Sequence, residues 1–168
     1  MSDLVIAADD PQRPDVVALL ETHLALMRRI SPPGHVHALD IERLTVPEVT
    51  FLSARTADDL LGVGALKDLG DGRAEIKSMH TAEAARGRGV GRRLVEHILG
   101  LAAERGIVWI GLETGSQPEF EPARSLYAAY GFAPCDPFDD YTVNPYSTCM
   151  EKTLDATAAG AGYSATGS

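Results

Sequence analysis

The stretch Arg86-Gly87-Arg88-Gly89-Val90-Gly91 connects a strand-like segment at residues 73–81 to a helical one at residues 89–105. Glycines at such a junction let the backbone approach a ligand closely, and the first N–H groups of a helix have no partner within the helix. Together with the helix dipole, these donors favour an anion such as a diphosphate. The neighbouring arginines add local positive charge, so the stretch predicts an anion-binding turn.

The spacing of the glycines excludes two common phosphate-binding loops. A P-loop needs Gly-Lys-Ser/Thr at the start of the helix, whereas Gly91 is followed by Arg92 and Arg93. A dinucleotide-binding loop needs a third glycine at position 92, which is Arg92. An enzyme that transfers phosphate from a nucleotide is also disfavoured, because the turn lacks the lysine and magnesium ligands of such enzymes.

Hydrophobic periodicity on both sides of the turn predicts a mixed α/β domain. The expected strands cover residues 4–8, 49–54, 60–69, 73–81, 107–112 and 147–154. Expected helices begin near Pro14, at residue 89 and at Pro122, and Gly106 and Gly131 end the last two. Residues 1–154 are expected to form one domain. Residues 155–168, rich in small residues, are expected to be a flexible tail.

Composition narrows the class of protein further. The chain has 168 residues, and 24 acidic against 15 basic residues give a formal net charge of −9, which disfavours nucleic acid as a partner. No apolar run approaches the roughly 20 residues that cross a bilayer, and the N-terminus has no export-signal pattern. Cys135 and Cys149 have no metal-like spacing, so no metal is expected. We therefore expect a cytoplasmic protein that binds no membrane.

The pattern Arg-x-x-Gly-x-Gly at residues 86–91 resembles the acyl-CoA diphosphate loop of the GNAT family of N-acetyltransferases. The resemblance continues in Leu126-Tyr127 and Gly131-Phe132, which follow the loop in the family's order. Lys77-Ser78-Met79-His80 and Leu112-Glu113-Thr114-Gly115 resemble a bacterial branch of these acetyltransferases. The similarity covers roughly residues 49–154.

This resemblance implies a fold and a co-substrate. The fold is a single α/β domain whose mixed, mostly antiparallel sheet is flanked by helices and splayed between the fourth and fifth strands. The co-substrate is acetyl-CoA, whose acetyl group passes directly to a primary amine in a ternary complex. Its pantetheine arm would pair with main-chain groups of the fourth strand, an edge-addition mode. The residues expected to bind acetyl-CoA are Met79, His80, Thr81, Arg86, Gly87, Arg88, Gly89, Val90, Gly91, Arg92 and Tyr127.

The chemistry requires a base, because an alkyl amine with a pKa of about 10 is protonated at neutral pH. Glu113 is the first candidate and Glu75 the second, although Glu113 would equally serve as a hydrogen-bond acceptor for the following turn. His80 is a possible proton relay, and strand alternation sets it on the face opposite Glu75. Tyr127 matches the family's acid that protonates the leaving thiolate; the alternative is a core tyrosine.

The acceptor site is the least specified part of the sequence. By resemblance, His37, Glu113 and Tyr141 lie where relatives bind the acceptor, and Asp139-Asp140 would either hold an ammonium group or form a solvated turn. A small amine, an amino acid, an antibiotic and a protein lysine all stay open, as does a homodimer. A non-catalytic acyl-CoA-binding sensor is the alternative to an enzyme.

Two positions depart from the family's pattern. Many relatives have proline where this chain has Glu83, and asparagine where it has Phe120. That asparagine often contacts the cofactor, so the second departure puts one polar contact to coenzyme A in doubt.

Overall fold

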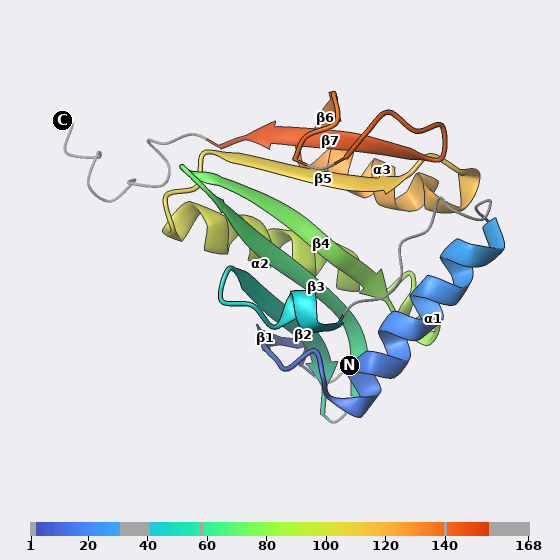
Figure 1. Ribbon diagram of the computed structural model, residues 1–168. Helices are drawn as coiled ribbons and strands as arrows, with labels where there is room; N and C mark the ends of the chain where they lie inside the picture. Colours follow the sequence, from blue (N-terminus) through green and yellow to red (C-terminus); the bar gives the residue numbers. More distant parts are fainter. Residues whose placement is uncertain (1–2, 31–40, 58, 140, 155–168) are drawn as a thin grey trace. The chain divides into compact units, whose positions relative to one another are not determined.

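The computed structural model describes residues 3–30, 41–57, 59–139 and 141–154 (Figure 1). The chain divides into two compact units, one formed by Met1–Leu66 and Lys77–Leu94, the other by Lys67–Ile76 and Val95–Ser168. We call them the first and second unit. The boundary falls inside two strands and one helix, so these three elements contribute residues to both units.

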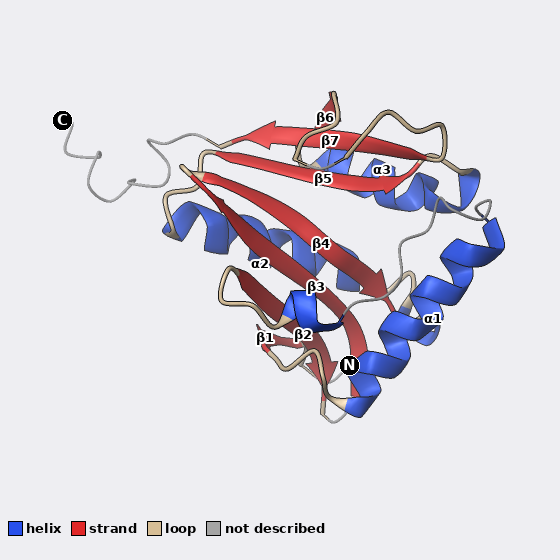
Figure 2. Cartoon of the chain, in the orientation of Figure 1, coloured by secondary structure: helices blue, strands red, loops and turns tan. Residues whose placement is uncertain are grey.

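Hydrogen bonding joins seven strands in the order β1-β2-β3-β4-β5-β7-β6 (Figure 2). The strands are β1 Val5–Ala8, β2 Val49–Thr56, β3 Asp59–Gly70, β4 Arg73–Thr81, β5 Trp109–Gly115, β6 Ala133–Cys135 and β7 Ser147–Thr153. The helices are α1 Pro14–Ile30, α2 Val90–Glu104 and α3 Glu121–Ala129, with short 3-10 helices at Ile41–Leu44, Glu83–Ala85 and Pro118–Phe120. β4 and β5 are parallel, whereas β1–β2, β5–β7 and β6–β7 are antiparallel. The predicted mixed, mostly antiparallel α/β sheet is confirmed.

The core of the first unit forms where α1 packs on the sheet. Val16 and Leu20 lie one helical turn apart on α1, and both are buried in a cluster with Phe51 of β2 and Val63 of β3. Leu44 of the first 3-10 helix completes this cluster. The apolar residues at helical spacing thus form the buried face of α1, and this face packs against β2 and β3.

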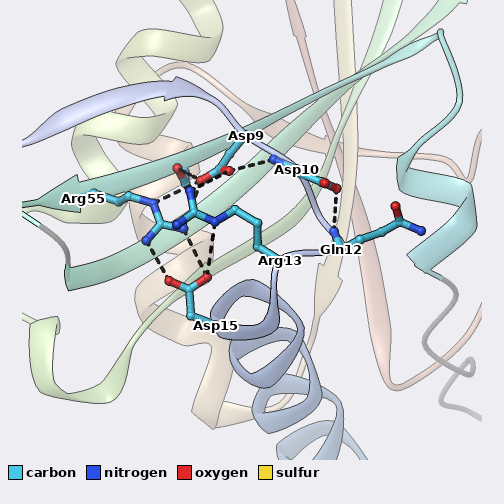
Figure 3. A network of polar contacts seen from close by, with 7 residues as sticks. Asp9, Asp10, Gln12, Arg13, Asp15 and Arg55 are labelled. Atoms are coloured by element: carbon cyan, nitrogen blue, oxygen red, sulfur yellow. Dashed lines mark hydrogen bonds and ion pairs between the residues drawn. The ribbon is translucent and has the colours of Figure 1, made fainter.

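An ion-pair network fixes the start of α1 in the same unit (Figure 3). The guanidinium of Arg55 on β2 donates hydrogen bonds to Asp15 at 2.7 and 3.2 Å and to Asp9 at 3.1 Å. The Ser53 hydroxyl also donates to Asp9, at 2.5 Å. Burial alone raises the pKa of Asp9, but the hydrogen bonds from Ser53, the Asp10 amide and Arg55 outweigh it, so this pKa lies below its usual value. The Arg55 hydrogen bond likewise lowers the pKa of Asp15.

In the second unit, strand register assigns every residue to one of two sheet faces. The start of β4 pairs with β5 from Arg73 opposite Trp109 to Ile76 opposite Leu112, and β5 pairs with β7 along its whole length. Because side chains alternate, the even-numbered positions share one face and the odd-numbered positions the other. The even face contributes buried apolar side chains: Ala74, Ile76, Ile110, Leu112 and Met150. The odd face carries the polar residues described below.

Two strand predictions need correction. The strand expected at 107–112 is wrong in its position, because β5 runs from Trp109 to Gly115. Ile107 and Val108 are used instead to turn the chain into the sheet, where the Val108 amide donates to the Gly72 carbonyl at 2.7 Å. The short edge strand β6 was not expected, since Pro134 at its centre disfavours a strand except at a sheet edge.

Several expectations stay untested. Residues 155–168, the predicted tail, lie outside the described residues, as does His37. The β4–β5 splay and the single-domain organisation stay predictions. Within the described ranges, no helix is long and apolar enough to cross a membrane.

We predict that Arg55→Met lowers the free energy of unfolding at pH 7 by about 1–2 kcal/mol, since Asp9 loses a charge-assisted partner and Asp15 is half exposed. Both aspartates have lowered pKa values, so their contribution is present above about pH 4 and is lost as the pH falls further. The difference between variant and wild type should therefore shrink at pH 3 in urea titrations. Arg13→Met, which removes a largely exposed guanidinium, is the control and should cost under about 0.5 kcal/mol. An equal Arg55→Met effect at both pH values would contradict this account.

Candidate functional site

The turn between β4 and α2 has the backbone that the sequence predicts. Gly87 and Gly89 have φ values of 79° and 80°, in the left-handed region that disfavours any residue with a Cβ. The Gly89 carbonyl accepts the Arg93 amide at 3.0 Å, so α2 begins directly after Gly89. Glycine has no side chain to cap the helix, and the amides of residues 90–92 precede the first intrahelical donor. They are therefore in position to bind an anion.

The turn is open and positively charged. A Cβ built on Gly87 would meet no atom within 4 Å, and at Gly89 it would meet only the Arg92 guanidinium, from 3.5 Å. The side chains of Arg86, Arg88 and Arg92 are all exposed. An anion at these amides would thus meet an arginine-rich surface in a chain of net charge −9.

Close packing holds the start of α2 against the strands of the first unit. A Cβ on Gly62 of β3 would lie 2.9 Å from Val90 Cγ1 and 3.1 Å from the His80 carbonyl oxygen. Only glycine leaves room for this approach. The end of β4 is fixed as well, because the Ala82 amide donates to the Leu61 carbonyl at 2.8 Å. The strand end and the helix start therefore form one rigid support for the turn.

Ser78, inside β4, breaks the alternation of that strand. Its φ of 58° is left-handed, the backbone expected of a strand irregularity such as a bulge. The argument that set His80 on the face opposite Glu75 counts positions as though the strand were regular, so the face on which His80 lies stays a prediction. Met79 and Thr81, both half-buried, follow this irregularity.

His80 forms a buried pair with His23 of α1. The two ring centroids are 4.5 Å apart, and His80 is 9% exposed. Burial, His23 and the Arg86 charge together lower the pKa of His80 to about 3, and burial and Arg86 lower that of His23. His80 is therefore neutral at physiological pH. The predicted role of His80 as a proton relay stays a prediction.

Glu75 lies at the centre of the odd face of the second unit. Its carboxylate is 1% exposed, and its Oε2 accepts a hydrogen bond from the Tyr141 hydroxyl. Burial, the charge of Glu75 and their hydrogen bond raise the pKa of Tyr141, with a further contribution from Glu113. Sequence reasoning named Glu75, Glu113 and Tyr141 separately, and the structure brings all three together.

Glu113 lies on the same face, two positions beyond the residue that pairs with Glu75. It is half-buried, and its Oε2 accepts a hydrogen bond from the Ser147 hydroxyl at 3.0 Å. Cys149 is its direct partner across β7. We call Glu75, Glu113 and Tyr141 the carboxylate cluster.

Tyr141 of this cluster also belongs to a pair of packed rings, which we call the aromatic strap. It is formed by Phe138 and Tyr141, whose rings meet edge to face at 5.3 Å, and Phe138 meets Trp109 of β5 in the same way at 5.1 Å. A Cβ on Gly111 would lie 2.3 Å from Trp109 and 2.7 Å from Phe138. Because Gly111 has no Cβ, it leaves the space that the rings of Trp109 and Phe138 occupy. Trp109 and Phe138 also line a surface cleft of about 510 Å³.

Sequence reasoning missed Trp109 and Ser147 as parts of this site, and it named Phe138 only as part of the segment that lies where relatives build the acceptor site. A signal was present in Gly111, a glycine inside an otherwise apolar strand, which often marks a close approach of other atoms. The opposing segment lies more than 25 positions away in sequence, so the partner of that glycine is visible only in the structure.

Tyr127 is buried on α3, 5% exposed, with its ring edge to face against Phe132 at 5.7 Å. Burial raises its pKa, so the phenol stays protonated at neutral pH and is a donor rather than a base. The structure therefore agrees with both sequence interpretations, a core tyrosine and a proton donor. Tyr130, one turn on, donates instead to Glu96 at 2.5 Å.

Phe120 stands where many relatives have asparagine, and its ring lies against Gly115 at the end of β5. A Cβ on Gly115 would lie 2.1 Å from its ring. The guanidinium of Arg124 donates to the carbonyls of Gly115 and Gln117 at 2.7 and 3.0 Å. This segment thus uses an aromatic ring and an arginine where the family's pattern has a short polar side chain.

Comparison with known proteins agrees with this geometry. The family model described as "Acetyltransferase (GNAT) family" matches residues 17–132. An uncharacterized N-acetyltransferase of Bacillus subtilis, YsnE, is 46% identical over 149 residues, which cover 89% of this chain and 99% of that protein. The IAA acetyltransferase of Azospirillum brasilense is 36% identical over 156 residues, 92% of this chain and 100% of that protein. A B. subtilis acetyltransferase solved in complex with CoA has the same fold, with a TM-score of 0.67 and 20% identity, covering 90% of this chain and 99% of that one.

We predict that Gly89→Val weakens coenzyme A binding tenfold or more, about 1.4 kcal/mol, because valine cannot adopt the left-handed backbone that aims the turn's amides. Isothermal titration calorimetry of the purified variant measures this directly. Gly100→Ala is the matched control, since Gly100 lies within α2, has open space around it and should leave affinity unchanged. Unchanged affinity in Gly89→Val would refute the assignment of the turn.

Proposed function

Because this chain belongs to the acetyltransferase (GNAT) family, we propose that it transfers an acetyl group directly to a primary amine within a ternary complex. It is an acyl-CoA-dependent N-acetyltransferase, and acetyl-CoA is its co-substrate. The observation that carries the proposal is the turn at residues 86–91, where two left-handed glycines expose the start of α2. We propose that the amides of residues 87–92 hold the diphosphate of acetyl-CoA and that Arg86, Arg88 and Arg92 add charge attraction.

We propose that the main chain at Met79, His80 and Thr81 pairs with the amides of the pantetheine arm. The left-handed Ser78 supports this role, because an irregularity inside a strand redirects the main-chain groups that follow it. Donors and acceptors at the end of β4 would then extend toward a ligand as a strand edge does.

The carboxylate cluster supplies the base. An ammonium must lose a proton before its nitrogen attacks the thioester carbon, and a carboxylate takes this proton directly or through one water. Glu113 is half-buried and more accessible, whereas Glu75 is deeper and is held by Tyr141. Negative charge on the same face would also attract the cationic acceptor before it loses its proton.

Tyr127 is proposed to protonate the leaving thiolate of coenzyme A. Its raised pKa keeps the hydroxyl protonated until the reaction, when the C–S bond breaks and the sulfur takes up negative charge. The nitrogen–carbon bond forms as the carbon–sulfur bond breaks, the amine proton passes to the base and the thiolate takes a proton from the acid.

The state of the cysteines supports direct transfer over an acetyl-enzyme. Burial and the nearby charge of Glu151 raise the pKa of Cys135 to about 11, and burial raises that of Cys149. Thiols of such high pKa carry almost no thiolate at neutral pH and are poor nucleophiles.

The acceptor is proposed to be a small amine or an amino-acid-like molecule in the cytoplasm, with a protein lysine as the other class to be tested. A thiol-release assay should therefore include diamines, amino acids, an aminoglycoside and a lysine peptide. Acetyl-CoA-dependent turnover of at least one of them supports the proposal. Tight coenzyme A binding with no turnover on any acceptor would favour a sensor, and size-exclusion chromatography tests the expected homodimer.

We predict that Tyr127→Phe lowers kcat at least tenfold while the affinity for coenzyme A changes less than about twofold, because the hydroxyl stabilises the negative charge that develops on sulfur in the transition state. Tyr130→Phe removes a hydroxyl of the same helix region that donates to Glu96, and it serves as the control for loss of a phenol. Full activity in Tyr127→Phe would leave it a core tyrosine and assign the proton to another donor.

We also predict that Glu75→Gln and Glu113→Gln each reduce kcat/KM, with the larger loss in the residue that serves as the base, on the order of a hundredfold. Circular dichroism should show both variants folded, since glutamine keeps the shape of the side chain. Activity within a factor of two of wild type in both would remove the cluster from the mechanism.

A further inference from the structure

We propose that Tyr141 is a positioning residue of the transfer reaction, whose hydroxyl holds the Glu75 carboxylate ionised and in one orientation. This inference rests on the proposed function and goes beyond it, because that proposal leaves the base open between Glu113 and Glu75 whereas this inference assigns it to Glu75. The family resemblance predicts another role for Tyr141, contact with the acceptor. The structure instead turns its hydroxyl onto Glu75 Oε2.

Burial makes this hydrogen bond necessary. Glu75 is 1% exposed, and a carboxylate removed from water is costly unless strong donors satisfy it. Tyr141 supplies an O–H donor to the charged form, which is among the stronger classes of protein hydrogen bond. A donor to the charged form favours ionisation, so loss of this donor favours the protonated acid.

The groups near Glu75 include a second carboxylate, a thiol and two cations on its own strand. Glu113 lies on the same sheet face and carries a like charge, so it cannot neutralise Glu75. The charges of Glu113 and Glu75 both help to raise the pKa of Cys149 on β7, and its thiol is neutral. On its own strand Glu75 has Arg73 and Lys77 two positions away on either side. Tyr141 is the neutral donor of this group, and the raised pKa of its phenol keeps the proton in place.

The aromatic strap fixes where the hydroxyl points. Phe138 lies between Tyr141 and Trp109, in edge-to-face contact with each, and the Tyr141 amide donates to the Phe138 carbonyl at 3.0 Å. Trp109 is held in turn, because its indole N–H donates to Glu151 at 2.9 Å and the Arg73 guanidinium lies 4.4 Å from its ring centre. The packed rings of Trp109, Phe138 and Tyr141 therefore connect the first residue of β5 to the hydrogen bond on Glu75.

The decisive variant is Tyr141→Phe, which keeps the ring and removes the hydroxyl. We expect the acidic limb of the kcat/KM profile to move to higher pH by about one unit, a tenfold loss of rate on that limb, because Glu75 then holds its proton more strongly. The plateau at high pH should change less than about threefold. Tyr130→Phe, which removes the hydrogen bond to Glu96, is the matched control and should leave the profile in place.

A second measurement needs no turnover. The carboxyl carbon of Glu75, followed by NMR in the ligand-free protein, should titrate at a pH about one unit higher in Tyr141→Phe than in wild type. If the wild type transfers no acetyl group but this shift occurs, the proposed function fails, and only the effect of the Tyr141 hydroxyl on the Glu75 carboxylate stands. If Tyr141→Phe does not fold, Phe138→Leu loosens the strap, keeps the hydroxyl, and should shift the same titration in the same direction by a smaller amount.

An acidic limb that stays in place or moves to lower pH would overturn the proposal. A move to lower pH would instead make Glu113 the base, because Glu113 ionises more readily once Glu75 beside it is neutral.

Discussion

The structure depends above all on the left-handed backbone at Gly87 and Gly89. These two residues let the chain leave β4 and enter α2 directly after Gly89, and no other residue type takes both conformations without strain. Gly62 makes a related contribution, since only a residue without a Cβ lets α2 lie this close to β3 and to the end of β4. The proposed anion site is thus set by backbone geometry, and the arginines around it would add charge attraction.

The second unit solves a different problem, which is how to keep carboxylates on a largely buried sheet face. The odd-numbered face of β4, β5 and β7 carries Glu75 and Glu113. Glu75 accepts a hydrogen bond from the Tyr141 hydroxyl, and Glu113 accepts one from the Ser147 hydroxyl. The even-numbered face supplies aliphatic side chains to the core. One short sheet therefore places aliphatic side chains on one face and the two carboxylates on the other, where Gly111 leaves room for the rings of Trp109 and Phe138.

Most of the fold was predictable, because periodicity and turn glycines act locally. The extent of β4, the start of α2 and the left-handed stop at Gly106 follow from neighbouring residues alone. The errors arose where a distant segment decides the outcome. β5 begins two residues late because the chain at Val108 is hydrogen-bonded to Gly72, and β6 exists only because β7 offers it a partner. The left-handed backbone of Ser78 is likewise not predicted by any local residue preference.

The candidate site divides in the same way. The glycine turn was readable because its residues are consecutive, whereas the Tyr141–Glu75 hydrogen bond joins residues 66 positions apart. NMR of the backbone amides during titration with coenzyme A tests the central claim most directly. The account predicts that the amides of residues 87–92 show the largest shifts and that they saturate together. Large shifts confined to other segments, with these amides unchanged, would contradict it.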